Sequence, residues 1–471
     1  MIKLNNNTSH RKNKIINYVI IGNSAAGISA AENIRKLDKK GSIVILTSEG
    51  YLNYSKPLIT YYIAGKVSLE KINFKKDEFY KCNNIYLELD SEVKHIDTIK
   101  KIVITVSGKE IHFNKLLIAN GGKPIIPEIK IRKSSYKKVN NTGRLERNFN
   151  DNFINLENLN DIKGIYKLTA LKDAIKIKKY IEEKKIKSVS ILGGGLIGLK
   201  SAEAFLEAGL RVNIIELSNR IMSATFDKEA SDIIENIIKS KGSNVFTNDT
   251  IEIIYINKKR IISYKLRSGK KVESSLLIIA VGVKPDTSII NDGSIQLSNG
   301  IIVDNFMRTT QEDVFAAGDV INSYDVVLNK ERNIAIWPLA VRQGVVAGIN
   351  MAGGNKRYCG GFFMNSIEIL GIPSVSMGIT NLDNNMQKNV KILKDYNNER
   401  NFYKKIIVKE DKIIGVIMIG NIERAGIYAG LIKNKIDVSN IIENINREDF
   451  GIIQLPLKYR KHMVVGEGIE V

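Results

Sequence analysis

The chain has 471 residues, 44% of them hydrophobic, and a formal net charge of +21. This length exceeds what a single hydrophobic core supports, so we expect two or three domains. The apolar runs are too short to cross a bilayer, which predicts no membrane span. Residues 1–14 are Asn-rich and basic and lack the apolar stretch of a secretory signal, so they predict a disordered tail on a cytoplasmic protein.

The cysteine count limits the redox chemistry of the chain. Cys82 and Cys359 are its only cysteines. They are too few for a disulfide framework, a CxxC zinc site or a four-cysteine iron–sulfur cluster, so we expect no metal site. The positive charge would favour an acidic partner, but Lys, Ile and Asn are abundant throughout, and a general bias in composition is the simpler explanation.

The first part of the chain has the pattern of an α/β domain. The apolar run 17–21 is followed by helical spacing through Leu37 and by a second apolar run at 43–46. A hairpin is expected at 102–113, and a further run at 116–119 ends in two glycines. These segments predict a strand, helix, strand unit extended by a hairpin.

The same design then recurs after an interruption. Residues 129–163 are rich in Lys, Arg and Asn and predict an exposed basic insertion. A strand at 189–192, a helix through Glu207, a strand at 212–215 and a strand that ends at Gly282 follow. Because the unit repeats, we expect an α/β protein with two related Rossmann-like, three-layer domains.

The last third of the chain changes its pattern. Residues 304–318 resume the pattern of the first domain, and from Gly360 the sequence alternates as in hairpins, such as 406–408 with 413–419. We therefore expect a C-terminal α+β domain.

The second glycine motif, GGGLIG at residues 193–198, follows a strand and opens a helix. Gly193 permits a tight turn, Gly195 lets a pyrophosphate approach the backbone, and Gly198 lets the helix pack on the strand. Glu216, at the end of the next strand, would accept hydrogen bonds from both ribose hydroxyls and repel a 2′-phosphate. The motif favours NAD over NADP, and Arg220 is the main reason for caution.

The first glycine motif, GNSAAG at residues 22–27, is weaker because Ser24 replaces its middle glycine. A closely packed strand-to-helix turn could look the same. The preceding strand and the acidic Glu49, about 22 residues beyond Gly27, favour a nucleotide site. Two further strands strengthen this interpretation: one ends in Gly318-Asp319, and the other, 277–285, ends in a Gly/Pro turn that would return the chain from one domain to the other.

With these motifs, residues 17–449 resemble the FAD- and NAD-dependent pyridine nucleotide-disulfide oxidoreductase superfamily. The most similar branch contains rubredoxin reductases, ferredoxin reductases and the flavin module of NADH-dependent nitrite reductases. The resemblance implies that the first domain binds FAD, with Glu49 on the adenosine ribose and Asp319 on the ribityl chain and phosphate. Asn120 departs from the family pattern, which has a Thr-Gly pair at this place. The implied FAD contacts are Gly22, Ser24, Ala25, Ala26, Gly27, Glu49, Lys56, Pro57, Asn120, Gly121, Gly318, Asp319 and Trp337. The implied NAD contacts are Gly193, Gly195, Leu196, Ile197, Gly198, Glu216 and Gly282.

The loop NYSKPL at residues 53–58 bears on the mechanism. Some members of the family resemble NCGLP here and carry a redox cysteine beside the flavin, whereas here Tyr54 is expected at the place of that cysteine. The resemblance makes Tyr54, Lys56 and Trp337 candidates for residues near the flavin. It also places Lys200 where the family often has a glutamate near the nicotinamide; the amine could neutralise a pyrophosphate or face solvent.

The resemblance also implies domain boundaries. Residues 15–163 and 286–359 would form the FAD-binding domain, 164–285 the NAD-binding domain and 360–449 an interface domain, followed by a tail at 450–471.

The implied activity is that of an FAD-dependent NADH:acceptor oxidoreductase without a redox-active disulfide. Hydride would pass from NADH to N5 of the flavin, and electrons would pass on to a small acidic carrier of the iron–sulfur or rubredoxin/ferredoxin type. The interface domain would form a homodimer or dock the carrier. Two alternatives stay open: an NADH oxidase or a quinone or oxygen reductase, and a flavin-containing nucleic-acid-binding or signalling protein, which only the basic insertion supports.

Overall fold

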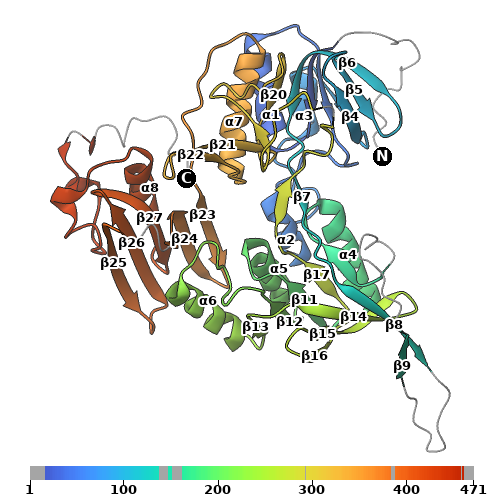
Figure 1. The fold of residues 1–471 in the computed structure, drawn as a ribbon, viewed down its shortest axis with the longest axis vertical. Helices are drawn as coiled ribbons and strands as arrows, with labels where there is room; N and C mark the ends of the chain where they lie inside the picture. The colour runs from blue at the N-terminus through green and yellow to red at the C-terminus, as the bar shows by residue number, and fades with distance from the viewer. Residues whose placement is uncertain are drawn as a thin grey trace, which may run out of the picture. The chain divides into compact units, whose positions relative to one another are not determined.

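The chain forms two compact units (Figure 1). The computed structural model describes residues 16–136, 147–150, 162–291, 293–382, 388–457 and 459–460. The first unit draws on Met1–Ser55, Asn73–Lys123 and Lys284–Gly361. The second unit draws on Lys56–Ile72, Pro124–Val283 and Phe362–Val471. The predicted disordered tail lies outside the described residues, as does almost all of the segment after residue 457.

The first unit is built on a sheet with the strand order β3-β2-β1-β6-β5-β4, and β20 pairs with β6. The pairs β1–β2, β2–β3, β1–β6 and β6–β20 are parallel, whereas β4, β5 and β6 form an antiparallel meander. The central strands are buried along nearly their whole length, as in parallel sheets covered on both faces. The bounds are β1 Ile16–Ile21, β2 Ile43–Leu46, β3 Ile85–Glu88, β4 Val93–Asp97, β5 Ile102–Thr105, β6 Glu110–Ile118 and β20 Val314–Ala316.

Helices α1 (Ala25–Leu37) and α7 (Trp337–Met351) pack directly against each other. A Cβ on Gly344 would lie 2.2 Å from the carbonyl oxygen of Ala26, so only glycine lets the two backbones approach this closely. Gly348 makes the same kind of contact one turn further on. The remaining elements of the unit are α3 (Asp77–Cys82) and a small sheet of β19 (Ile301–Ile302), β21 (Ile321–Asp325) and β22 (Lys330–Arg332).

The second unit contains a parallel sheet with the order β10-β17-β11-β12-β13. The strands are β10 Ile165–Lys167, β11 Ser188–Leu192, β12 Arg211–Ile215, β13 Asn244–Phe246 and β17 Leu277–Ile279, and the helices are α4 Leu171–Lys184, α5 Leu196–Glu207 and α6 Lys228–Ser240. The segment 56–72 also belongs here. It forms the 3₁₀ turn η1 (Lys56–Leu58) and helix α2 (Ile59–Ile63), and α2 packs on α4 and α5.

The segment 129–163 differs from the predicted exposed insertion. Lys130–Tyr136 forms strand β8, which pairs in parallel with β14 (Ile251–Asn257), and Ile131 is fully buried. The prediction was wrong for this stretch because its charged residues obscured an alternating apolar pattern. β9 (Arg147–Asn150) extends the same sheet, whose other strands are β15 (Arg260–Leu266) and β16 (Lys271–Glu273), and the rest of the insertion up to residue 161 lies outside the described residues.

The C-terminal part of the second unit is an antiparallel sheet with the order β23-β24-β27-β26-β25. Its strands are β23 Met364–Ile369, β24 Ile372–Gly378, β25 Val390–Asn397, β26 Phe402–Lys409 and β27 Lys412–Ile419, with helix α8 Ala425–Lys433 and the 3₁₀ turns η4 Ser439–Ile441 and η5 Ile452–Gln454. Short strands β7 (Gly122–Pro124) and β18 (Val283–Pro285) lie where the chain passes between units. The fold class predicted from the sequence, two Rossmann-like halves followed by an α+β part, is confirmed.

Candidate functional site

The turn between β1 and α1 holds the first glycine motif in a conformation that only glycine can adopt. Gly22 has φ +116°, and a Cβ on it would lie 2.1 Å from the carbonyl oxygen of Ala119. A Cβ on Gly27 would lie 2.0 Å from the carbonyl oxygen of Gly22. Ser24 is the N-cap of α1, yet its hydroxyl makes no capping hydrogen bond. The turn therefore presents a hydroxyl and a helix N-terminus, which together suit a phosphate.

A network of buried amides supports this turn from behind. The hydroxyl of Tyr80 donates to Oδ1 of Asn23 at 2.8 Å and accepts from Nδ2 of Asn53 at 2.8 Å. Asn53, 1% exposed, also bonds the backbone of Lys75 through both ends of its amide. Nδ2 of Asn23 is buried and has no hydrogen-bond partner among the described residues. Because a buried donor without an acceptor is costly, this atom fits a phosphate oxygen of a cofactor at the turn.

Glu49 lies just beyond β2, whose end is joined to the glycine turn by a 2.9 Å hydrogen bond from the Gly22 amide to the Leu46 carbonyl. The hydroxyl of Tyr54 reaches both carboxylate oxygens of Glu49, at 2.8 and 3.1 Å. The Tyr54 side chain is buried, with 6% of the residue exposed. The family resemblance implied that Tyr54 lies beside the flavin and that Glu49 binds the adenosine ribose. In the structure, the two side chains are hydrogen-bonded to each other.

The other candidate FAD residues of the first unit gather around the first turn of α1. Ala25 and Ala26 are buried there, and a Cβ on Gly318 would lie 3.3 Å from the Cβ of Ala26. The Gly318 amide donates to Oε1 of Gln343 in α7, a side chain that is 1% exposed. Asp319 follows directly, and its carbonyl accepts from Nδ2 of Asn333 at 2.8 Å.

Two further candidates frame this region within the first unit. Nδ2 of Asn120 donates to the carbonyl of Asp286 at 2.8 Å, while its Oδ1 is buried without a hydrogen-bond partner among the described residues. Gly121 follows at φ +78°. Trp337 opens α7 and packs edge-on against Phe74, with ring centroids 5.4 Å apart. An orphaned acceptor in Asn120 and an orphaned donor in Asn23 match the polar edges and phosphates of a dinucleotide.

Lys56 and Pro57 are candidate FAD residues that belong to the second unit. Both are exposed and begin the 3₁₀ turn η1, which belongs to the second unit.

The second glycine motif is built almost wholly from backbone. Gly193 has φ +112°, with a Cβ position 2.3 Å from the Ala280 carbonyl oxygen, and the Cβ position of Gly198 is 2.0 Å from the Gly193 carbonyl oxygen. A Cβ on Gly195, by contrast, would meet nothing within 4 Å. The N-terminus of α5 is thus open at Gly195, as a pyrophosphate requires. Leu196 and Ile197 follow with exposed side chains.

Backbone amides hold Glu216, at the end of β12. Oε2 accepts from the Gly194 amide at 2.6 Å, and Oε1 accepts from the Ser218 amide at 2.7 Å. Gly282, the last candidate NAD residue, lies beyond β17 with φ +114°. The carboxylate is therefore fixed beside the glycine turn before any ligand arrives.

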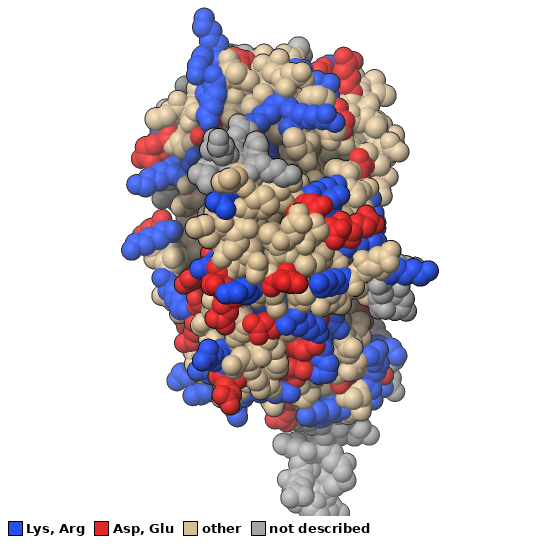
Figure 2. Space-filling view, turned by 90° about the vertical axis from the view of Figure 1, so that its left-hand side faces the viewer, with Lys and Arg blue, Asp and Glu red and all other residues tan. Residues whose placement is uncertain are grey.

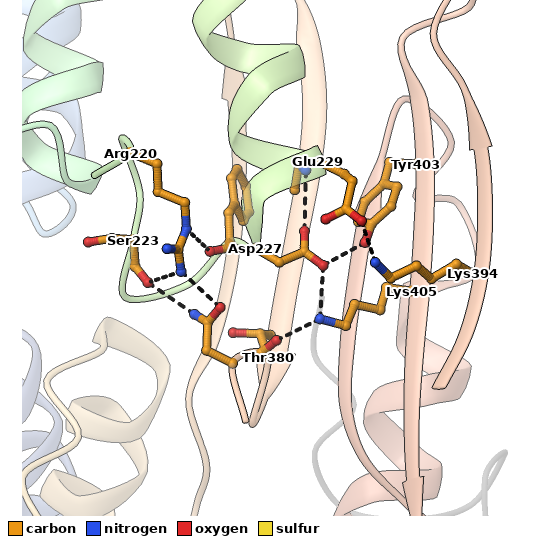
Figure 3. Close-up of polar contacts among 11 residues, drawn as sticks. Arg220, Ser223, Asp227, Glu229, Thr380, Lys394, Tyr403 and Lys405 are labelled. Carbon is orange, nitrogen blue, oxygen red and sulfur yellow. Dashed lines mark hydrogen bonds and ion pairs between the residues drawn. The ribbon is translucent and has the colours of Figure 1, made fainter. Parts of the chain in front are cut away.

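Arg220, the residue that cautioned against an NAD preference, has its guanidinium group bound elsewhere (Figure 3). It donates to the carbonyls of Phe226 and Ser223 and to the side-chain oxygens of Asn219 and Asn381, at 3.0 to 3.2 Å. The bond to Asn381 joins the loop after β12 to the C-terminal part of the chain, and the other three lie within the loop. A 2′-phosphate would have to displace them to recruit this cation.

Lys200 is held by partners within the protein and does not extend into solvent. Its amine forms an ion pair with the buried Glu203 and donates to the carbonyl of Glu368 at 3.0 Å, and its side chain is 17% exposed. Glu203 in turn accepts from the amide of Leu370. Lys200 and Glu203 therefore join α5 to β23, and the helical spacing of three residues between them was the only signal in the sequence.

Asn53, Tyr80 and Gln343 are the supporting residues that sequence reasoning gave no role. The bond between Asn53 and Tyr80 spans 27 positions that no local pattern connects. Cys82 and Cys359 are free and exposed. Within the described residues, no group of His, Cys, Asp and Glu has the arrangement of a metal site, and no helix has the length and apolar character to span a membrane.

Comparison with known proteins adds family information to this geometry. The family model described as pyridine nucleotide-disulphide oxidoreductase matches residues 16–344. The model described as rubredoxin NAD+ reductase C-terminal domain matches residues 364–436. The two matches together span most of each unit.

Individual relatives agree with these matches. The epsilon subunit of NADH-dependent phenylglyoxylate dehydrogenase from Aromatoleum evansii is 29% identical over 426 residues, covering 90% of this chain and 92% of the relative. NADH-rubredoxin oxidoreductase from Clostridium acetobutylicum is 28% identical over 431 residues, covering 92% and 97%. Among solved structures, the covalent putidaredoxin reductase–putidaredoxin complex has a similar fold, with a TM-score of 0.78 at 18% identity, and the match covers 96% of this chain and 99% of that one.

Proposed function

The chain belongs to the pyridine nucleotide-disulphide oxidoreductase family, and from this premise we propose that it is an FAD-dependent oxidoreductase that passes electrons from NADH to a small electron-carrier protein. One observation carries the proposal. Two glycine turns, each at a helix N-terminus and each beside an acidic residue after the next strand, occur in one chain at Gly22 to Gly27 and at Gly193 to Gly198. Each has the features of a dinucleotide site.

The residues of the first unit fit FAD. Ser24 and the N-terminus of α1 would hold the pyrophosphate, and Nδ2 of Asn23 would gain the acceptor that it lacks. Glu49 would bind the adenosine ribose, and Asp319 would bind the ribityl chain. When bound, FAD supplies the capacity to accept a hydride and to release electrons singly. The protein contributes binding, orientation and exclusion of water around it.

The residues of the second unit favour NADH over NADPH. Glu216 is fixed by two backbone amides and would accept hydrogen bonds from the ribose hydroxyls, whereas a 2′-phosphate would meet its negative charge. Arg220 is committed to carbonyl and amide oxygens and offers no free cation in compensation. The NADH-dependent relatives support the same preference.

The acceptor follows from the cysteines and the relatives. Tyr54 lies in the loop where some family members are expected to carry a redox cysteine, and Cys82 and Cys359 lie elsewhere in the chain. Electrons would therefore leave the flavin directly rather than through a thiol. A relative is an NADH-rubredoxin oxidoreductase, and the C-terminal part matches a rubredoxin reductase domain, which supports a carrier of the rubredoxin or ferredoxin type.

The charge of the surface bears on how such a carrier would dock. Figure 2 shows Lys and Arg interspersed with Asp and Glu over the face in view, rather than gathered in one basic patch. The net charge of +21 would still attract an acidic carrier over long range. We also propose that the C-terminal domain forms a homodimer contact or docks the carrier, and that the protein is cytoplasmic.

Anaerobic titration of the purified protein with NADH and with NADPH tests the proposal. We expect a yellow protein whose flavin absorbance is bleached by NADH much faster than by NADPH. Reduced protein would then be mixed with a rubredoxin, a [2Fe–2S] ferredoxin, a quinone or air in a stopped-flow instrument. Fast reoxidation by one of the carriers supports the proposal. Reoxidation by air alone at turnover speed would assign the protein as an oxidase, and absence of bound flavin would refute the proposal altogether.

A further inference from the structure

The contact between Tyr54 and Glu49 has no counterpart in the sequence-based account of either residue. The Tyr54 hydroxyl is shared between both oxygens of the Glu49 carboxylate, at 2.8 and 3.1 Å. The ring is buried, so the hydroxyl cannot exchange this bond for water without moving the side chain. Glu49 itself is only half-buried and sits in a loop after β2. A side chain with this freedom needs a partner to keep one orientation.

The second unit shows how a carboxylate at this position can be held without such a partner. Glu216 receives one hydrogen bond from the amide of Gly194, the second residue of its glycine turn, and another from Ser218. The equivalent residue of the first turn is Asn23, and among the described residues its backbone amide makes no hydrogen bond to the carboxylate of Glu49. In the first unit, the hydroxyl of Tyr54 provides the bond to the carboxylate instead.

A carboxylate can accept about four hydrogen bonds, and one tyrosine hydroxyl occupies only a small part of that capacity. Because the Tyr54 hydroxyl contacts both oxygens of Glu49 but has a single hydrogen to donate, each oxygen keeps lone pairs that Tyr54 does not occupy. They are then available for the two hydroxyls of a ribose. A hydrogen bond to a charged group is also stronger than one between neutral groups, so the orientation is firmly set.

We propose that Tyr54 is a positioning residue that holds Glu49 for the adenosine ribose, and that the pair selects FAD over flavins that lack adenosine. The inference rests on the proposed function, because it assigns the first glycine turn to FAD. It changes the role of Tyr54 from a neighbour of the flavin ring to a determinant of which flavin is bound.

Titration of the apoprotein with FAD and with FMN, followed by flavin fluorescence, tests the inference. Tyr54→Phe keeps the ring and removes the hydroxyl, so the Kd for FAD should rise about tenfold. The Kd for FMN, which has the isoalloxazine and one phosphate but no adenosine, should change less than about twofold. Tyr51→Phe is the matched control, since Tyr51 lies on the same loop with an exposed side chain, and it should leave both constants unchanged.

A double-mutant cycle gives a second readout that does not depend on FMN. Glu49→Ala alone should raise the Kd for FAD about thirtyfold, and adding Tyr54→Phe to it should have no further effect, because the hydroxyl then has no carboxylate to position. Additive effects of the two substitutions, or a Tyr54→Phe variant that binds FAD as tightly as the wild type, would overturn the inference and leave the proposed function standing. A wild-type apoprotein that does not bind FAD would instead refute the proposed function.

Discussion

Each glycine turn has an acidic residue beside it, and the two acidic residues are held by different groups. In the second unit, backbone amides of Gly194 and Ser218 fix the acidic residue Glu216. In the first unit, side chains make the corresponding bonds: the Tyr54 hydroxyl donates to Glu49, and the Tyr80 hydroxyl donates to Asn23. Because a backbone site is defined by the turn itself, it can be recognised from a short motif. A site defined by side chains from distant loops cannot.

Helix α6 of the second unit has an additional anchor, and its removal is the largest change that we expect. Asp227 caps α6 and accepts hydrogen bonds from Tyr403 and Lys405 of β26, at 2.6 and 2.8 Å (Figure 3). Asp227→Ala leaves the buried Lys405 without its carboxylate and should lower the free energy of unfolding by about 4 kcal/mol, measured by urea denaturation. Glu229→Ala is the control, because the exposed pair of Glu229 with Lys394 contributes under about 1 kcal/mol.

The same pair of Asp227 and Lys405 should make the free energy of unfolding fall as the pH is lowered. Burial by itself would raise the pKa of Asp227, but the hydrogen bonds from Lys405 and Tyr403 outweigh it and hold the pKa below the ordinary value. A carboxylate whose pKa is lowered on folding stabilises the protein above its unfolded-state pKa and loses that effect as the pH falls through its folded-state pKa. The difference between wild type and Asp227→Ala should therefore shrink in acid. A difference that is constant down to pH 3 would contradict this assignment.

The two halves should respond alike where their geometry is alike. Gly27→Ala and Gly198→Ala each place a methyl group 2.0 Å from a carbonyl oxygen of the preceding turn. Each should destabilise the protein by about 3 kcal/mol in thermal or chemical unfolding, since the helix must move off the strand. Gly195→Ala, whose added Cβ meets nothing within 4 Å, should leave the stability unchanged. Markedly unequal effects of the first two would show that the halves are not packed in the same way.

Substitutions of the two acidic residues should each affect the binding of a different cofactor. Glu216→Gln should raise the KM for NADH about tenfold, or about 1.4 kcal/mol, with the flavin content unchanged. Glu49→Gln should instead weaken FAD binding and leave the KM for NADH of the FAD-saturated enzyme unchanged. Steady-state kinetics at saturating FAD measure both. If either substitution affected both cofactors equally, the assignment of one dinucleotide to each half would be wrong.

The smallest effect concerns Arg220. Because its guanidinium group is bound to Ser223, Phe226 and Asn381, it should not contribute to the choice between NADH and NADPH. Arg220→Ala should therefore change the ratio of kcat/KM for the two nucleotides by less than about twofold. A large loss of NADPH activity would show that the arginine leaves its partners to bind a 2′-phosphate.

The sequence predicted the fold well, because its signals are local. Periodicity in the sequence predicts the helices that begin at Ala25 and Leu196 and the hairpin of β26 and β27. Turn residues predict the return of the chain to the first unit near residue 283. The family resemblance is also confirmed. The prediction from the sequence was wrong for the segment 129–136, where charged residues follow the buried Ile129 and Ile131.

The site was predicted less completely, because its supporting contacts are not local. Asn53 and Tyr80 bind across 27 positions, and Lys200 bonds to Glu368 across 168. No spacing in the sequence encodes either contact. Assignments of individual residues to FAD or NAD remain predictions, and the titrations above address them.

The contact between α1 and α7 has a consequence for the order in which the protein is made. α1 carries the first glycine turn, yet the helix that braces it through Gly344 and Gly348 is synthesised more than 300 residues later. The second glycine turn and its whole parallel sheet, by contrast, are complete by residue 279. On the ribosome, we expect the parallel sheet with the second glycine turn to fold first. The unit with the first glycine turn would then complete its folding only after α7 has emerged. Flavin capture would then be among the last events in the synthesis of the chain.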